Sequence, residues 1–272
     1  MIMKLTTFFK YFFFILVLVA CVAKAQEVDD EREFSYEEDS ENGPAHWGEI
    51  HPEWRACNSG SMQSPIDMVN ERVKIVSHLG LLDRTYWPSN ATLINRGHDM
   101  MLRWPGGAGH IQINRTQYHL RQSHWHSPSE HTINGRRFDM EIHLVHQSND
   151  NRTAVIVILY KIGRPDSFLS MMKRNLEAVV DTRDVEKVVG FIDPELIKFG
   201  SRKYYRYIGS LTTPPCTENV IWTIVRKVRT VSREQVELIR DAVHDDSEAN
   251  ARPIQPINGR KVELYRPNDR EN

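Results

Sequence analysis

The chain has 272 residues, of which 40% are hydrophobic and 26% charged, and its formal charge at pH 7 is −1. This length suits one large domain or two small ones and allows a sizeable core. The near-neutral charge argues against a nucleic-acid-binding protein, because neutralising phosphates requires a basic surface.

The N-terminus has the features of a secretory signal. Two lysines precede the apolar run 11–23, which ends in the sequence Ala-Lys-Ala. A basic start, a short apolar segment and a small-x-small end predict that residues 1–25 are a cleaved signal peptide and that the protein enters the secretory pathway. The apolar run is shorter than the roughly 20 residues of a membrane-spanning helix, so we expect no stable membrane insertion.

Secretion decides how the cysteines are interpreted. Cys21 would leave with the signal peptide, and Cys57 and Cys216 would remain in an oxidising compartment. We predict a disulfide between them, with two buried thiols as the alternative. The same compartment would allow N-glycosylation at three Asn-x-Thr sequons, which begin at Asn90, Asn114 and Asn151.

The remaining chain favours a single, mostly β domain. Residues 26–33 form an acidic leader, and short strand-like segments follow, separated by Gly, Pro, Asn and Asp. Two continuous β-branched runs, 155–160 and 220–225, are typical of strands buried on both faces. Helices are expected at 167–180 and after the capping-box pattern that begins at Ser232. We predict a domain over 34–267 with a few peripheral helices, followed by a C-terminal tail at 268–272.

Two of the strand-like segments carry three histidines. Strand alternation predicts that one face of the first segment carries Leu120, Gln122, His124 and His126. In the second segment, 138–145, His143 faces away from the apolar side chains. An Asn-Gly pair at 134–135 lies between the two segments and is a strong hairpin signal. Pairing of the two strands would bring the three imidazoles together.

Three imidazoles with a fourth position open are typical of a catalytic zinc site, since structural sites use four protein ligands. Gln122 precedes His124 by two residues, and Glu141 precedes His143 by two, so each can accept the far ring N–H of its neighbour. The alternative is that some of the 12 histidines are interior groups satisfied by hydrogen bonds. The pattern favours a Zn²⁺ site.

The chain resembles the alpha carbonic anhydrases, most closely those of land plants. The resemblance covers about residues 34–267 and rests on several motifs in the same order. These motifs are Gln63–Asp67, Asn95–His98, Ser123–Ser127, Ser129–Thr132, Glu141–His146 and Ser210–Cys216. The resemblance implies a large central, mainly antiparallel twisted sheet with short helices outside it, and it pairs Cys57 with Cys216.

The resemblance also implies an activity, the reversible hydration of carbon dioxide to bicarbonate and a proton by zinc-bound hydroxide. Thr212, oriented by Glu130, would position this nucleophile, and Thr213 would contact bicarbonate. His98 would act as the proton shuttle at the cavity mouth, and Tyr36 would match the family's tyrosine near the solvent network. The residues that would form an apolar wall for carbon dioxide are Val145, Val155, Leu211 and Trp222.

Some features depart from the family or leave other readings open. Arg96 and Met101 replace residues that are commonly Asn in the cavity, and a cation at Arg96 should disfavour the protonated form of His98. Relatives that reuse the fold make a secreted storage or binding protein the alternative function, and ester hydrolysis is a further one. The compartment would be extracellular, or the chloroplast stroma reached by the secretory route.

Overall fold

The computed structural model describes residues 33–241 and 249–267, and strands dominate these ranges. The predicted signal peptide, nearly all of the acidic leader and the C-terminal tail lie outside the described residues. The strands are β1 (Asp67–Met68), β2 (Val73–Val76), β3 (Asp83–Tyr86), β4 (Ser89–Asn95), β5 (Met100–Arg103), β6 (Gly109–Ile113), β7 (Thr116–His126), β8 (Thr132–Ile133), β9 (Met140–Gln147), β10 (Thr153–Ile162), β11 (Lys187–Ile192), β12 (Tyr204–Ser210), β13 (Glu218–Val225), β14 (Arg229–Val231) and β15 (Val262–Tyr265).

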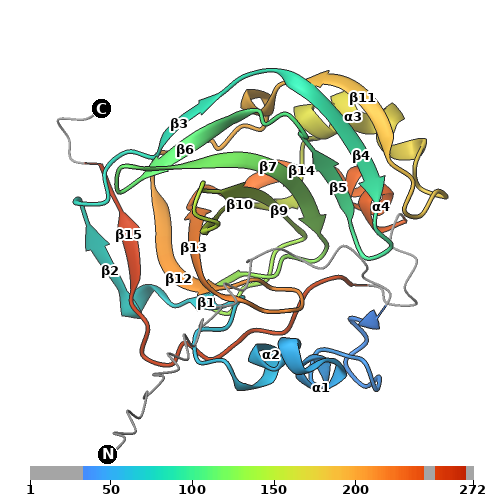
Figure 1. The fold of residues 1–272 in the computed structure, drawn as a ribbon. Helices are drawn as coiled ribbons and strands as arrows, with labels where there is room; N and C mark the ends of the chain where they lie inside the picture. The colour runs from blue at the N-terminus through green and yellow to red at the C-terminus, as the bar shows by residue number, and fades with distance from the viewer. Residues whose placement is uncertain (1–32, 242–248, 268–272) are drawn as a thin grey trace, which may run out of the picture.

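Within the described residues, a 13-stranded sheet curves through the molecule (Figure 1). Its main path runs β11-β4-β5-β7-β9-β10-β13-β12-β15-β2, and β3, β6 and β14 attach beside this path. Most pairs are antiparallel, as predicted, but β10 pairs in parallel with β13 and β14, and β15 pairs in parallel with β2. The sheet is therefore mixed. Parallel neighbours are joined by long connections, so the sequence pattern alone did not indicate these pairs.

In the described ranges the helices are few and short. They are α1 (Trp47–Ile50), α2 (Ala56–Ser59), α3 (Ser167–Glu177) and α4 (Arg233–Arg240), together with single 3₁₀ turns at Pro52–Trp54, Asn70–Arg72 and Pro194–Leu196. The side chain of Asp166 caps α3 by accepting from two backbone N–H groups. The predicted capping box of α4 is present, with Ser232 and Gln235 bonded reciprocally. None of the helices in the described ranges is both long and apolar enough to span a membrane.

The hydrophobic core lies on both faces of the sheet. On one face, α3 and α4 pack against each other and bury side chains such as Phe168, Met172 and Ile239. The other face holds a second cluster around Val155, which includes Tyr205, Tyr207 and Trp222. Because β10 separates these clusters, its residues 153–160 are all buried, as the β-branched run predicted.

The strands that carry the three histidines are direct neighbours. β7 pairs antiparallel with β9, and His124 lies opposite His143 in this register. The Asn134-Gly135 pair forms the expected tight turn, with positive φ at both residues and Ile133 and Arg136 bonded across it. The hairpin signal therefore marked the reversal that brings the strands together.

One sequence-based placement on β7 is wrong. Leu120 was expected on the same face as His124, but a bulge between Leu120 and Gln122 shifts the register there. Leu120 therefore packs with Ile142 and Leu144 in the core on the opposite face of the sheet. A bulge inserts one extra residue, so the alternation of side chains changes phase at that point.

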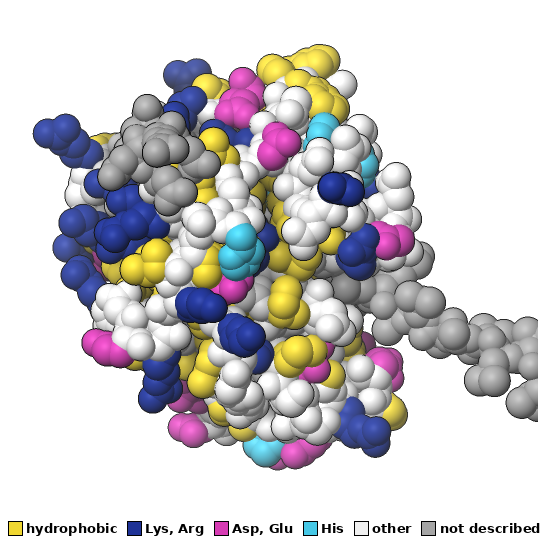
Figure 2. All heavy atoms as spheres, turned by 90° about the vertical axis from the view of Figure 1, so that its left-hand side faces the viewer, with side chains coloured by type: hydrophobic (Ala, Val, Ile, Leu, Met, Phe, Trp, Pro, Cys, Tyr) yellow, Lys and Arg dark blue, Asp and Glu magenta, His cyan; other side chains and the backbone are white. Residues whose placement is uncertain are grey.

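Charged side chains are distributed unevenly over the surface. Figure 2 shows the face on the side of β2 and β15, where Lys and Arg side chains gather on one half among isolated hydrophobic ones. Because the whole chain carries a charge of only −1, this local excess must be offset by acidic residues elsewhere.

Candidate metal centre

His124 and His126 extend from β7, and His143 extends from β9 beside them. The register sets His124 opposite His143, and alternation along β7 brings His126 to the same face. All three side chains are buried, with exposed fractions of 1% each. The three imidazoles therefore lie together and are buried, and the sequence predicted that they would be brought together.

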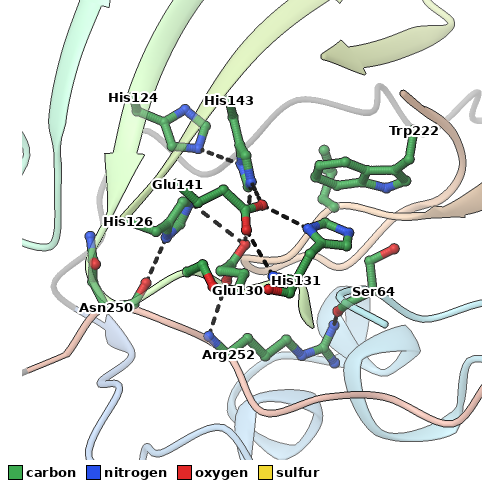
Figure 3. Close-up of polar contacts among 12 residues, drawn as sticks. Ser64, His124, His126, Glu130, His131, Glu141, His143, Trp222, Asn250 and Arg252 are labelled. Atoms are coloured by element: carbon green, nitrogen blue, oxygen red, sulfur yellow. Dashed lines mark hydrogen bonds and ion pairs between the residues drawn. The ribbon is translucent and has the colours of Figure 1, made fainter. Parts of the chain in front are cut away.

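Hydrogen bonds fix the tautomer of each ring, and Figure 3 shows the surroundings of His126 and His143. The Nδ1–H of His124 donates to Gln122 Oε1 at 2.9 Å, and the Nε2–H of His143 donates to Glu141 Oε1 at 2.6 Å. Both partners were predicted. The Nδ1–H of His126 donates to the backbone carbonyl of Asn250 at 2.6 Å, a partner that the sequence did not indicate. A backbone acceptor leaves no side-chain signature, and Asn250 is 124 residues away.

These bonds engage one nitrogen of each ring. Nδ1 of His143 lies 3.1 Å from Nε2 of His124, and one ring nitrogen of each of the three histidines lies within 4.8 Å of one from the other two. Two nitrogens bound tetrahedrally at about 2.0–2.1 Å from one zinc ion would be about 3.3 Å apart. Nε2 of His126 is buried and has no hydrogen-bond partner among the described residues, which a bound cation would explain. The donor set fits zinc.

Burial keeps two of the rings neutral, the state that a metal ligand requires. Desolvation holds the pKa of His124 well below its usual range and lowers that of His143 to about 4. Burial acts to lower the pKa of His126 as well, but the Glu130 carboxylate, the hydrogen bond to the Asn250 carbonyl and the charges of Asp99 and Glu141 together outweigh it and raise the pKa of that ring.

A chain of hydrogen bonds extends outward from His143. His131 Nδ1 donates to Glu141 Oε1 at 2.7 Å, and its backbone N–H donates to Glu141 Oε2. With Nδ1 protonated, Nε2 of His131 accepts from the Tyr207 hydroxyl at 2.8 Å, and Tyr207 in turn lies 2.8 Å from Ser64 Oγ. Burial would raise the pKa of Glu141, but His131 and His143 hold it well below its usual range. Glu141 is therefore a carboxylate that supports His143, and His131 is a structural member of this chain.

Glu130 lies beneath the three histidines. Its Oε1 accepts from the backbone N–H of Arg252 at 3.0 Å. Its buried Oε2 has no hydrogen-bond partner in the described part of the chain and lies 3.6 Å from Nε2 of His126. Thr212 is buried at 5% exposure. The expected bond from Thr212 to Glu130 is therefore not made at Oε2, and that oxygen stays available to accept one. Arg252, which the sequence did not single out, holds Glu130 in position.

The predicted apolar wall is formed as a unit. Val145 pairs across the sheet with Val155, and Val155 pairs with Trp222 on β13. All three belong to one hydrophobic cluster together with Leu211. Trp222 also lies beside the His143 ring, with ring centroids 5.0 Å apart. The wall therefore borders the histidines directly. Thr213, the residue after Thr212, is buried too. Its hydroxyl has no hydrogen-bond partner among the described residues.

His98 differs from the expectation of a mobile ring at the cavity mouth. Its side chain is only 3% exposed. The ring stacks on Phe34 with centroids 4.8 Å apart and meets Tyr36 edge-on at 5.6 Å. Its backbone carbonyl accepts from Asn250 Nδ2 at 2.7 Å. The N-terminal aromatic residues cover the ring, which a pattern read along the chain could not indicate.

Arg96 is neutralised by a residue that the sequence did not single out. Arg96 Nε donates to Asp99 Oδ1 at 2.8 Å, and both side chains are buried. Burial would raise the pKa of Asp99, but Arg96 lowers it to about 2. The expected repulsion between Arg96 and His98 is therefore offset by the Asp99 carboxylate. Met101, the other unusual cavity residue, lies opposite His124 across the β5–β7 pair.

The predicted disulfide joins Cys57 to Cys216, and both cysteines are buried. It lies in a cluster with Phe34, Tyr36, Trp47 and Trp54. The bridge ties this N-terminal cluster to the loop that carries Thr212 and Thr213. The sequons begin at exposed residues: Asn90 lies on β4, and Asn114 and Asn151 lie in turns with positive φ.

Comparison with known proteins agrees with this architecture. Residues 42–266 match the family model of the eukaryotic-type carbonic anhydrases. The chain is 60% identical to alpha carbonic anhydrase 7 of Arabidopsis thaliana over 263 residues, which cover 96% of each protein.

Solved structures show the same fold. A structure of dioscorin complexed with ascorbate matches with a TM-score of 0.84 at 44% identity, covering 87% of this chain and 99% of that one. The alpha carbonic anhydrase of Thermovibrio ammonificans, complexed with the inhibitor sulfanilamide, matches with a TM-score of 0.74 at 34% identity, covering 85% and 98%. The chain therefore belongs to the eukaryotic-type carbonic anhydrase family and is a land-plant member of the alpha class.

Proposed function

We propose that this protein is a zinc-dependent enzyme that catalyses the reversible hydration of carbon dioxide to bicarbonate and a proton. The observation that carries the proposal is the convergence of three buried imidazoles, each of which is held by a specific hydrogen bond at its other ring nitrogen. When bound there, zinc would supply a nucleophile at neutral pH by lowering the pKa of water to about 7, as carbonic anhydrases themselves exemplify.

The protein would contribute positioning around this centre. Gln122, Asn250 and Glu141 hold the three rings in place through their bonded N–H groups. Glu130 Oε2 can accept a hydrogen bond from the Thr212 hydroxyl. The Thr212 oxygen would then act only as an acceptor toward the nucleophile and so orient it. This hydrogen bond would also satisfy the buried carboxylate oxygen, which is costly to leave without a partner.

The substrates fit the remaining surfaces. Carbon dioxide is apolar, and the wall of Val145, Val155, Leu211 and Trp222 offers an apolar surface beside His143. Thr213 has an unpartnered hydroxyl that can contact bicarbonate. His98 is the imidazole that we assign to proton transfer, because an imidazole can both donate and accept a proton in general acid–base catalysis. It would work from beneath Phe34 rather than from an exposed loop.

The test is a pair of measurements on the purified mature protein, zinc content per chain and stopped-flow carbon dioxide hydration. We expect one zinc per chain and hydration that His124→Gln reduces by at least about 100-fold, with zinc lost. His119→Gln is the matched control, since His119 lies on the same strand but outside the centre. Well below one zinc per chain together with no hydration, with the disulfide intact, would contradict the proposal.

A binding or storage role is the second candidate. It is favoured by the close structural match to dioscorin, whose structure was solved with ascorbate. Ascorbate titrated into the zinc-loaded protein distinguishes the two functions. Saturable binding in a protein without hydration activity would support the binding role, whereas hydration without binding supports the enzyme.

We further propose that residues 1–25 direct the protein into the secretory pathway and are removed. This would place it in the extracellular space, or in the chloroplast by the secretory route. The disulfide between Cys57 and Cys216 supports an oxidising compartment. N-terminal sequencing of the secreted protein should begin at Gln26, and a mature chain that retains residues 1–25 would exclude a signal peptide.

A further inference from the structure

The outer edge of the sheet carries an apolar surface that the proposed catalysis does not use. β11 pairs only with β4 on the main path and lies at the end of the sheet opposite β2 (Figure 1). Phe191 and Val188 on β11 are 73% and 72% exposed, and they are the most exposed large hydrophobic side chains of the described residues. Such a surface on an edge strand promotes association unless something covers it.

A predicted glycosylation sequon lies directly beside this surface. In the antiparallel pair of β4 and β11, Asn90 is opposite Phe191, and Thr92 is opposite Val188. Along β4, Asn90 is exposed and Thr92 is partly exposed, whereas Ala91 and Leu93 between and beyond them are buried. Side chains directly opposite each other project from the same face, with Cβ atoms about 4.5–5.5 Å apart. A group attached to Asn90 would therefore extend over Phe191.

We propose that Asn90 carries an N-linked glycan whose first N-acetylglucosamine packs on Phe191 and Val188. One face of this sugar presents C–H groups, and the negative face of an aromatic ring attracts them. Burying this face also removes apolar area from water. The hydroxyl and amide groups at the sugar's edge would meet polar neighbours. Arg103, opposite Thr92 on the other side of β4, is paired with Glu186 at 2.6 Å and supplies such groups.

The attachment step needs a lipid-linked oligosaccharide, which the secretory pathway would supply. Nδ2 of Asn90 loses a proton and forms a bond to the anomeric carbon of the first sugar. The bond from that carbon to the carrier diphosphate breaks, and the lipid diphosphate leaves. The proposal therefore rests on the proposed secretory entry, but it does not depend on zinc or on catalysis.

The other two sequons lack this arrangement. Asn114 and Asn151 lie in turns between strands. The strand residues that pair across the first turn are Ile113 and Thr116, and those across the second are Gln147 and Thr153. Among the described residues, none of these four is an exposed large hydrophobic. A glycan at either turn would extend into solvent, so these sites serve as internal controls.

The experiment uses the full chain secreted from a eukaryotic host, with Asn114→Gly and Asn151→Gly so that Asn90 is the one sequon left. Glycine tolerates the positive φ of 49° and 63° at these turns. Mass spectrometry measures occupancy of Asn90. One sample is trimmed to its first sugar with an endoglycosidase, and another is fully deglycosylated with an amidase. The melting temperature Tm is then compared among the three forms.

We expect Asn90 to be occupied and full deglycosylation to lower Tm by about 2–4 °C, whereas trimming to the first sugar leaves Tm nearly unchanged. Phe191→Ser should abolish the difference between trimmed and deglycosylated forms. Ile75→Ser is the matched control, because Ile75 is also an exposed strand residue, at 59%, but lies on β2 far from any sequon in the sheet. It should retain the full difference.

Two results would overturn the proposal. One is an unoccupied Asn90 in secreted protein, and the other is an equal Tm difference with Phe191→Ser. If Asn90 is unoccupied and the protein sediments as a dimer that Phe191→Ser dissociates, the surface belongs to a second copy instead. Failure of secretion would count against the signal peptide alone, and replacing residues 1–25 with the host's own signal would then allow the same comparison.

Discussion

Each of the three site histidines is held by a different kind of acceptor. His124 uses a side-chain amide, His126 a backbone carbonyl and His143 a carboxylate. The carboxylate differs from the others because its charge makes the ring it supports a stronger electron donor. Glu141 is also bonded to His131, so its position is constrained from two sides.

Replacing Glu141 should weaken the metal site without emptying it. We expect Glu141→Gln to lower zinc affinity about 10–100-fold, because the amide removes the charge behind His143 and breaks the bonding to His131. Competition with a chromophoric chelator measures the affinity. His119→Gln should leave it unchanged, and an unaltered affinity in Glu141→Gln would contradict a supporting role for the carboxylate.

His98 is the residue whose surroundings differ most from the sequence-based expectation. If it transfers the proton, His98→Ala should lower turnover by about 10-fold or more, since a positioned proton-transfer group contributes about 10²–10⁴-fold. High concentrations of imidazole buffer should restore part of the loss. Stopped-flow hydration at low and high buffer concentration measures both effects. A loss that imidazole does not restore would remove His98 from this role.

At the scale of elements, β9 brings different chemistry to its two faces. His143 and Val145 face the metal centre, whereas His146 is buried on the other side, bonded to the Tyr86 hydroxyl at 2.7 Å. Burial lowers the pKa of His146 from 6.5 to about 3. The folded protein therefore keeps this ring neutral at pH values where the unfolded chain would protonate it.

This depressed pKa predicts an acid-dependent loss of stability. The contribution of neutral His146 is fully present above pH 6.5 and is lost progressively as the pH falls toward about 3. The loss is at most about 1.4 kcal/mol per pH unit, because only the unfolded state binds the proton in that range.

His146→Gln, which keeps a partner for Tyr86, should reduce this dependence. Urea unfolding between pH 7 and pH 4 should show a shallower decline in the free energy of unfolding for the variant than for the wild type. The metal-ligand histidines are the same in both proteins, so their titration cancels in the comparison. Parallel declines would show that His146 does not contribute.

At the scale of the whole molecule, a few long-range contacts hold the ends of the chain to the sheet. The disulfide spans 159 residues and joins the N-terminal aromatic cluster to the loop after Thr213. Arg252, near the C-terminus, donates to the carbonyls of Cys57 and Ser64 and to Gln63. These contacts meet next to Glu130, so the ends of the chain help to position the centre.

Removing the disulfide should destabilise the whole domain. A loop of this length predicts a cost of about 5 kcal/mol in the chain-entropy model, and measured losses are typically about 2–5 kcal/mol. We expect Cys57→Ser/Cys216→Ser to lower the free energy of unfolding in urea by about this amount. Reductant should not change the stability of the variant. A loss below about 1 kcal/mol would show that the bridge adds little to the surrounding aromatic cluster.

The sequence by itself determined the features that depend on nearby residues. Strand-like patterns located β7, β9 and β10, the capping-box motif located the start of α4, and the two-residue spacings identified Gln122 and Glu141. These signals arise within one strand or one turn. The motif set then indicated the family and the three metal-binding histidines. These predictions needed no knowledge of how distant segments meet.

Only the tertiary structure decided the features that depend on segments far apart in the chain. The carbonyl of Asn250 behind His126, the support of Glu130 by Arg252 and the cover of Phe34 over His98 join residues with no local pattern in common. The bulge that turned Leu120 to the opposite face is likewise a property of the strand pair and not of β7 alone. Backbone acceptors, bulges and packed aromatic side chains depend on contacts between separate elements. The three histidines could therefore be predicted from the sequence, whereas their surroundings could not.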